Sequence, residues 1–155
     1  MTATPKSLGY HFPAEFEKHE ATWLSWPHKE ASWPGKIHTV YAPYAQFIRC
    51  LSQDEKVRIN VRDEKMKDFA LQHIAAAGAN LSNVEFFFHP TNDAWCRDHG
   101  PAFVVNRSKG TKAVVDWGYN AWGGKYPPFD LDDVIPTRIG GHFGLQVYNP
   151  GIVME

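Results

Sequence analysis

The segment between Pro90 and Pro101 is the sequence feature that most constrains how this chain can fold. An apolar, strand-like run enters the segment at 84–88, and a second one leaves it at 103–105. Between the two prolines the chain carries reactive groups in close succession: Asn92, Asp93, Trp95, Cys96, Arg97, Asp98 and His99. Reactive side chains commonly lie on loops held by rigid elements. We therefore expect a functional loop between two strands.

The hydrophobic pattern on either side of this loop predicts alternating strands and helices. Residues 21–26, 56–61 and 84–88 have strand patterns, and apolar residues at 40–51 and 66–74 recur at helical spacing. Asp63 is placed to cap the second helix, and Gly78 to end it. After the loop we expect a hairpin of strands 102–106 and 111–117, a helix at 130–142 limited or kinked by Pro136, and strands at 146–149 and 151–154. This order indicates an α/β or α+β domain.

Composition and charge exclude several classes of function. The net charge of -1 comes without a basic face, which argues against nucleic-acid binding. No apolar run approaches a membrane span, and the first six residues contain no signal-peptide core, so we expect an intracellular protein without a membrane partner. The length of 155 residues suits one domain or part of a larger one.

Asp98 is the first candidate binding residue. A carboxylate can accept a bidentate pair of N–H bonds from a planar cation such as a guanidinium group. It could instead pair with a local arginine or cap a turn. Arg97, its neighbour, would point away from it if the segment is extended.

Three neighbouring residues have both structural and functional interpretations. Asp93 can bond to its own backbone in a turn, as Asx residues often do. Trp95 can stack on a cationic group or simply fill the core. Cys96 is a weak candidate nucleophile, because on an extended segment it would share a face with Asp98, whose charge disfavours a thiolate. We expect Cys96 to be a spectator and Cys50 to serve packing.

No metal or phosphate motif is evident. The histidines show no ligand spacing, and the segment around Gly123–Lys125 has tyrosines where a phosphate-binding loop needs glycine and serine or threonine. The residues alone therefore predict a cation-binding site without a convincing nucleophile or base.

Several blocks of the chain resemble the agmatine deiminases, a group that also includes the Porphyromonas-type peptidylarginine deiminases. The blocks follow the family's order: Pro13–Leu24, Trp26–His28, Trp33–Gly35, Thr91–Trp95 with Arg97, Asp98, Gly100 and Pro101, and then Trp117, Asn120 and Trp122–Tyr126. The block around Asp98 is the most specific of them, and together the blocks span essentially the whole chain.

The resemblance implies a fold and a reaction. The fold is the pentein α/β propeller of five ββαβ units, of which this chain would supply about two. The reaction is hydrolysis of agmatine to N-carbamoylputrescine and ammonia, in the synthesis of the polyamine putrescine. A cysteine thiolate attacks the guanidinium carbon and a histidine shuttles protons. No metal or organic cofactor is expected, and the whole protein would be a cytoplasmic homo-oligomer.

The resemblance also assigns roles to residues. Asp98 and Glu155 would be the catalytic carboxylates, and Trp95, Asp93 and Trp117 would bind the substrate. The nucleophile and the histidine of the family fall beyond Glu155. We therefore expect residues 1–155 to be the N-terminal portion of a single catalytic domain, truncated at its C-terminal end and inactive alone.

Three alternatives remain open at this point. The protein could be a peptidylarginine deiminase, or a non-catalytic polyamine-binding module that uses Asp98 and Trp95 as an acidic and aromatic cage. It could also be a structural fragment that pairs with its missing half.

Overall fold

The computed structural model describes residues 3–154, which form two compact units. The contiguous unit comprises His19–Cys96, and the split unit combines residues 3–18 with residues 97–154. Each unit has its own three-stranded sheet. The expected α/β class is confirmed, but the described residues form no closed propeller, and the number of ββαβ units remains a prediction.

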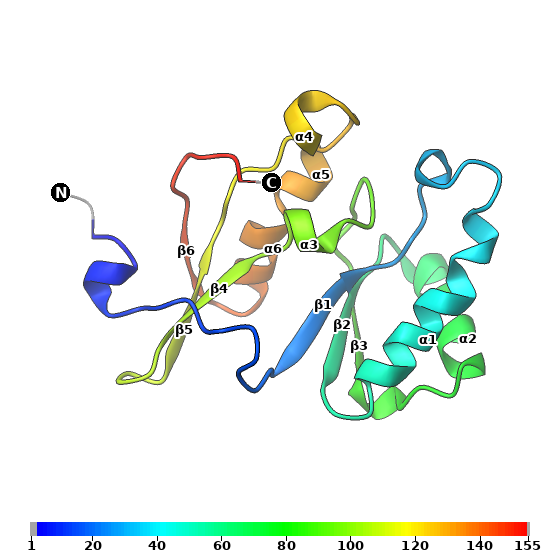
Figure 1. Ribbon diagram of the computed structural model, residues 1–155, viewed down its shortest axis with the longest axis horizontal. Coiled ribbons are helices and arrows are strands. Elements are labelled where there is room, and N and C mark those ends of the chain that lie inside the picture. The colour runs from blue at the N-terminus through cyan, green and yellow to red at the C-terminus, as the bar shows by residue number, and fades with distance from the viewer. Residues whose placement is uncertain (1–2, 155) are drawn as a thin grey trace. The chain divides into compact units, whose positions relative to one another are not determined.

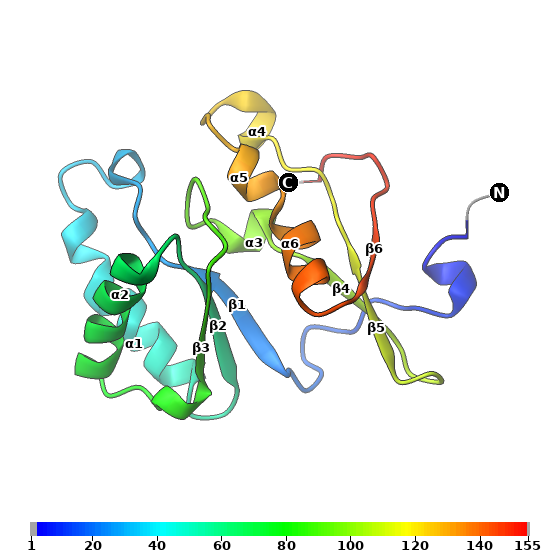
Figure 2. The same ribbon diagram turned by 180° about the vertical axis from the view of Figure 1, so that it is seen from behind.

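The contiguous unit is a parallel sheet covered by helices on one face. Its elements are β1 (Ala21–Ser25), α1 (Tyr41–Leu51), β2 (Lys56–Asn60), α2 (Glu64–Ala76) and β3 (Val84–Phe87), with the 3-10 helices η2 (Glu30–Ser32), η3 (Ile37–Thr39) and η4 (Leu81–Asn83) between them. The strands lie in the order β1-β2-β3, with Ala21 opposite Lys56 and Val57 opposite Val84. Figures 1 and 2 show α1 and α2 side by side on the same face of this sheet. Parallel strands need such crossover connections.

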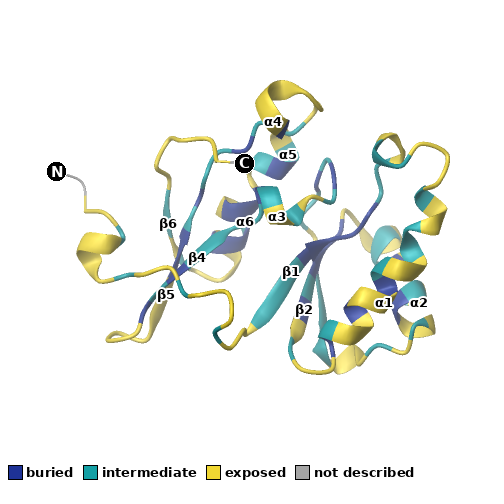
Figure 3. Cartoon of the chain, in the orientation of Figure 1, coloured by how far each residue is buried: buried dark blue, intermediate teal, exposed yellow. Residues whose placement is uncertain are grey.

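The core of this unit lies between the sheet and the two helices. Figure 3 shows buried positions along β2 and at the carboxyl end of β1. Burying one such aliphatic side chain contributes about 1.5–3 kcal/mol. The buried members of the core are Leu24, Trp26, Ala45, Ile48, Val57, Ile59, Val61, Ala70 and Ile74.

The boundaries of these elements follow the expected signals closely. The Asp63 side chain accepts a hydrogen bond from the Met66 N–H at 2.8 Å and caps α2, as predicted. Gly78 follows that helix with a φ of +78°, a conformation that favours glycine. The predicted strand 21–26 ends one residue early in β1, although the Trp26 N–H still bonds to the Asn60 carbonyl at 3.1 Å.

The split unit is built on a mixed sheet. β4 (Ala102–Asn106) and β5 (Thr111–Val115) form the predicted antiparallel hairpin, and β6 (Gln146–Tyr148) lies parallel to β5. The helices are η1 (Lys6–Leu8), α4 (Ala121–Gly124), α5 (Asp130–Asp133) and α6 (Ile135–His142), and α3 (Cys96–His99) spans the boundary with the contiguous unit.

The N-terminal segment belongs to the split unit through contacts with β4. His11 forms an antiparallel bridge with Val105, and the Asn106 side-chain amide donates to the Leu8 carbonyl at 2.9 Å. Residues from the two ends of the sequence thus build one unit.

Helix α6 packs on β5 and β6 through small and apolar residues. Ile135 and Ile139 are fully buried. Gly140 faces Val147 so closely that a Cβ at this position would lie 2.4 Å from the Val147 Cγ2. A side chain at residue 140 would therefore separate α6 from β6.

The helix expected at 130–142 is interrupted at Val134 into α5 and α6, in line with the limit or kink expected from Pro136, which lies in the first turn of α6, where proline is best tolerated. A different expectation about this unit was wrong. The strand expected at 151–154 is only an isolated bridge between Val153 and Gly118. The glycine-bearing segment around Gly123–Lys125 contains the end of α4, a helix that includes positive φ angles at Ala121 and Trp122.

Within the described part of the chain, helices long and apolar enough to cross a membrane are absent.

Candidate functional site

The loop from His89 to Trp95 follows β3 and is fastened to the segment after β1. The Nδ1 atom of His28 lies 2.9 Å from the Trp26 carbonyl oxygen, and its Nε2 atom lies 3.0 Å from the Thr91 carbonyl oxygen. A carbonyl oxygen only accepts hydrogen bonds and a neutral imidazole carries a single N–H, so which of the two carbonyls receives the hydrogen bond depends on the tautomer of His28. His28 therefore joins the end of β1 to the loop.

Asp93 is the most firmly held residue of this loop. It is 5% exposed, and its Oδ2 atom accepts from the Ser32 hydroxyl at 2.5 Å. Lys29 Nζ lies 3.7 Å from the same oxygen, while Oδ1 accepts from the Ala94 N–H at 2.8 Å. These contacts occupy both carboxylate oxygens. Asp93 thus anchors the loop to η2, in line with its structural interpretation.

Trp95 lies against a second indole. Its ring centroid is 5.7 Å from that of Trp33, with an interplanar angle of 29°, so the two rings are stacked. Trp95 remains 39% exposed. The Trp33 contact, which the sequence analysis missed, gives the contiguous unit an aromatic surface beside Asp93. The Trp33–Gly35 segment was the sequence signal that drew attention to Trp33, but nothing in it connects Trp33 with Trp95.

The segment around Asp98 is helical, which corrects the geometry expected from the sequence. Cys96 and Asp98 lie in α3, and residues two apart on a helix do not share a face, so the argument that the Asp98 charge suppresses a Cys96 thiolate was wrong in its geometry. Both residues are partly buried. Arg97 is exposed and donates to Glu15 at 2.8 Å, and this hydrogen bond raises the pKa of Arg97.

His99 is a buried residue to which the sequence analysis gave no role. It is 1% exposed, its Nε2 atom lies 4.0 Å from Asp132 Oδ1, and its ring meets the Tyr119 ring edge-on at 5.9 Å. The neighbouring Asp133 accepts from the Tyr119 N–H at 2.7 Å. The acids of α5 thus contact residues that follow Asp98 in the sequence.

A further carboxylate lies close to these acids in the split unit. Asp116 is 6% exposed and accepts from the Thr137 hydroxyl at 2.5 Å. Burial raises its pKa.

The two remaining predicted residues are Trp117 and Glu155. Trp117 is half-buried and lies two residues after the end of β5. Glu155 lies outside the described residues. Cys50 is exposed, so the packing role expected for it was wrong.

Comparison with known proteins identifies the family to which the chain belongs. The family model of the Porphyromonas-type peptidyl-arginine deiminases matches residues 11–155. The chain belongs to this family.

Members of the family resemble the chain in sequence and in fold. An agmatine deiminase from Ectopseudomonas mendocina is 32% identical over 160 residues, covering 100% of the chain and 42% of that protein. The structure of an agmatine deiminase from Enterococcus faecalis matches 96% of the chain with a TM-score of 0.81 and 29% identity. A C. jejuni agmatine deiminase with substrate bound matches 90% with a TM-score of 0.74 and 25% identity.

The chain spans only part of each of these family members. It covers 42% of the E. mendocina protein, 40% of the E. faecalis chain and 39% of the C. jejuni chain. The roles expected for Asp98, Asp93, Trp95, Trp117 and Glu155 remain predictions.

Proposed function

We propose that the protein carrying this chain hydrolyses the guanidinium group of agmatine, giving N-carbamoylputrescine and ammonia for polyamine synthesis. The observation that carries the proposal is the similarity to agmatine deiminases along the whole chain, 32% identity to the E. mendocina enzyme. We further propose that it acts in the cytoplasm on this small molecule, as a homo-oligomer and without a metal or organic cofactor.

Two carboxylates would grip the substrate. Asp98 would accept two N–H bonds from the planar guanidinium group, and Glu155 would serve as the second carboxylate. Trp95 and Trp117 would form apolar walls, and an indole face also attracts a cation. Asp93 would contribute by holding the loop that carries Trp95, since its oxygens already accept from Ser32 and Ala94.

The chemistry would proceed through a covalent intermediate. A cysteine thiolate forms a bond to the guanidinium carbon, and ammonia leaves with a proton supplied by a histidine. Water then attacks the thiouronium carbon, which releases the ureido product and returns the thiol. Carboxylates aimed at the guanidinium nitrogens fix the carbon near the sulfur and match the substrate's charge. The resemblance assigns the nucleophile to neither Cys50 nor Cys96, so we place it and the histidine elsewhere in the protein.

The test is a colorimetric assay of the ureido product with the intact protein. We expect Asp98→Asn to lower kcat/KM by roughly a hundredfold or more, because two charge-assisted hydrogen bonds of about 1.5–3 kcal/mol each are weakened. Asp68→Asn, at an exposed position on α2, is the matched control and should retain activity. Near-normal turnover of the Asp98 variant would remove this residue from the site.

A peptidylarginine deiminase activity is the second candidate, because the description of the matching family names that reaction. The same assay with agmatine and with an arginine-containing peptide separates the two. Turnover of the peptide at a higher kcat/KM than agmatine would replace the first proposal with the second.

A further inference from the structure

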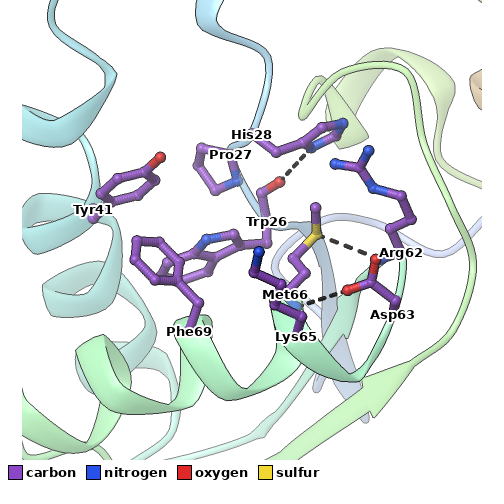
Figure 4. Close-up of a pocket in the computed structure, with 9 residues that line it drawn as sticks. All are labelled: Trp26, Pro27, His28, Tyr41, Arg62, Asp63, Lys65, Met66 and Phe69. Carbon is purple, nitrogen blue, oxygen red and sulfur yellow. Dashed lines mark hydrogen bonds between the residues drawn. The ribbon is translucent and has the colours of Figure 1, made fainter.

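The contiguous unit contains a pocket that the proposed reaction does not use. Its volume is about 370 Å³, within the range of small-molecule sites. It lies where β1 and β2 end and α2 begins, and in open parallel sheets ligands commonly bind at the carboxyl ends of strands. Figure 4 shows the lining residues: Trp26, Pro27, His28, Tyr41, Arg62, Asp63, Lys65, Met66 and Phe69.

One side of the pocket is a set of aromatic rings. The Trp26 and Tyr41 rings are stacked, with centroids 5.9 Å apart and an interplanar angle of 5°. Phe69 meets Tyr41 edge-on at 4.9 Å and is 41% exposed. A flat ring could lie against Tyr41 and Phe69, because aromatic pairs favour such offset or edge contacts.

The pocket also carries an excess of positive charge. Arg62 and Lys65 are exposed, and neither forms an ion pair within residues 3–154, whereas the nearby Lys67 pairs with Glu64 at 2.9 Å. The single carboxylate of the pocket, Asp63, is engaged in capping α2. The start of a thirteen-residue helix adds partial positive charge, so an anion is favoured here.

A buried donor in the pocket points to a ligand acceptor. Trp26 is 1% exposed, and no described residue accepts a hydrogen bond from its indole N–H. Figure 4 draws this nitrogen on the ring edge that faces Pro27 and Tyr41. A buried donor without an acceptor is unfavourable. The lining of this pocket thus includes a buried donor whose acceptor a ligand would supply.

His28, by contrast, offers no donor to the pocket. Its two ring nitrogens already face the carbonyl oxygens of Trp26 and Thr91. The same contacts link the pocket wall to the loop that carries Trp95.

We propose that this pocket binds a small anion that carries a flat aromatic ring. The ring lies against Tyr41 and Phe69, and a phosphate or carboxylate group lies between Arg62 and Lys65 at the start of α2. The charge of this ligand is opposite to that of the guanidinium substrate proposed above, so the inference does not depend on the proposed function.

The test is a titration of the intact, isotope-labelled protein with AMP and, separately, with benzoate, followed by NMR. We expect saturable shifts of the Trp26 indole N–H and of the Arg62 and Lys65 amides at ligand concentrations up to about 10 mM. The indole signal is assigned by its loss in Trp26→Phe. If that variant does not fold, the two backbone amides serve as the readout. A response to AMP alone or to benzoate alone supports the proposal and identifies the anionic group.

Matched variants locate the site. The double variant Arg62→Ala with Lys65→Ala should weaken binding about tenfold or more, while Lys67→Ala should change it less than about twofold. Absence of shifts with both ligands would overturn the proposal. So would equal binding by the double variant, or an equal response to inorganic phosphate alone, which would indicate an adventitious ion only.

Discussion

Replacing Asp93 should destabilise the contiguous unit far more than replacing an exposed aspartate. Asp93 is 5% exposed and accepts hydrogen bonds from the Ser32 hydroxyl and the Ala94 N–H, with Lys29 Nζ at 3.7 Å. In Asp93→Ala these donors lose a charged acceptor, and each charge-assisted bond contributes about 1.5–3 kcal/mol. We expect a loss of about 2–4 kcal/mol in the free energy of unfolding. Asp93→Asn, which keeps the shape and one oxygen, should lose about half as much.

A double-mutant cycle with Ser32 measures the contact itself. Ser32→Ala alone should cost about 1–2 kcal/mol, and the double variant should cost less than the sum of the two by about 1 kcal/mol, because the shared bond can be lost only once. Urea unfolding, followed by circular dichroism and by tryptophan fluorescence, provides these values and shows whether the two probes coincide. A cost below about 0.5 kcal/mol for Asp93→Ala, or strict additivity with Ser32→Ala, would refute the reasoning.

Two further predictions concern packing and pH. Gly140→Ala should lower the free energy of unfolding by about 1–3 kcal/mol, because the new Cβ would lie 2.4 Å from the Val147 Cγ2. Gly141→Ala on the same helix is the control: its Cβ meets nothing within 4 Å, so this variant should be neutral or slightly stabilising. Equal effects of the two variants in thermal unfolding would contradict this packing. The pKa of Glu85 is lowered from 4.5, first by its hydrogen bond with Lys56, so its contribution to stability is present above pH 4.5 and is lost as the pH falls through the lowered pKa. Urea unfolding should therefore show the wild type more stable than Glu85→Gln near neutral pH and the difference shrinking in acid; a difference independent of pH would show that the ion pair contributes nothing.

The elements that the sequence predicted best are those whose signals are local. The Asp63 cap, the stop at Gly78 and the strand at β2 depend on neighbours within a few residues, and the structure confirms them, although Ile59 and Asn60 at the end of β2 are both buried. Pro136 was likewise expected to limit or kink the helix at 130–142, and the helix is interrupted at Val134, with Pro136 in the first turn of α6.

The parts that sequence reasoning missed depend on contacts between distant residues. His99 is buried because Asp132 and Tyr119 lie against it, and no spacing rule connects these positions. The same holds for Ser32 with Asp93. For the segment around Asp98, the sequence predicted an extended conformation where the structure has α3, because a single helical turn is too short to produce a periodic pattern.

The origin of the split unit from two ends of the sequence has a consequence for protein synthesis. During translation, the whole of the contiguous unit, His19–Cys96, is synthesised before Val105 is available to form its bridge with His11. The sheet of the contiguous unit connects strands that follow one another along the chain, so it can form while translation continues. The N-terminal segment can form its bridge only after β4 has been synthesised. Until then, the backbone around His11 has no β-sheet partner, while the contiguous unit can already be folded.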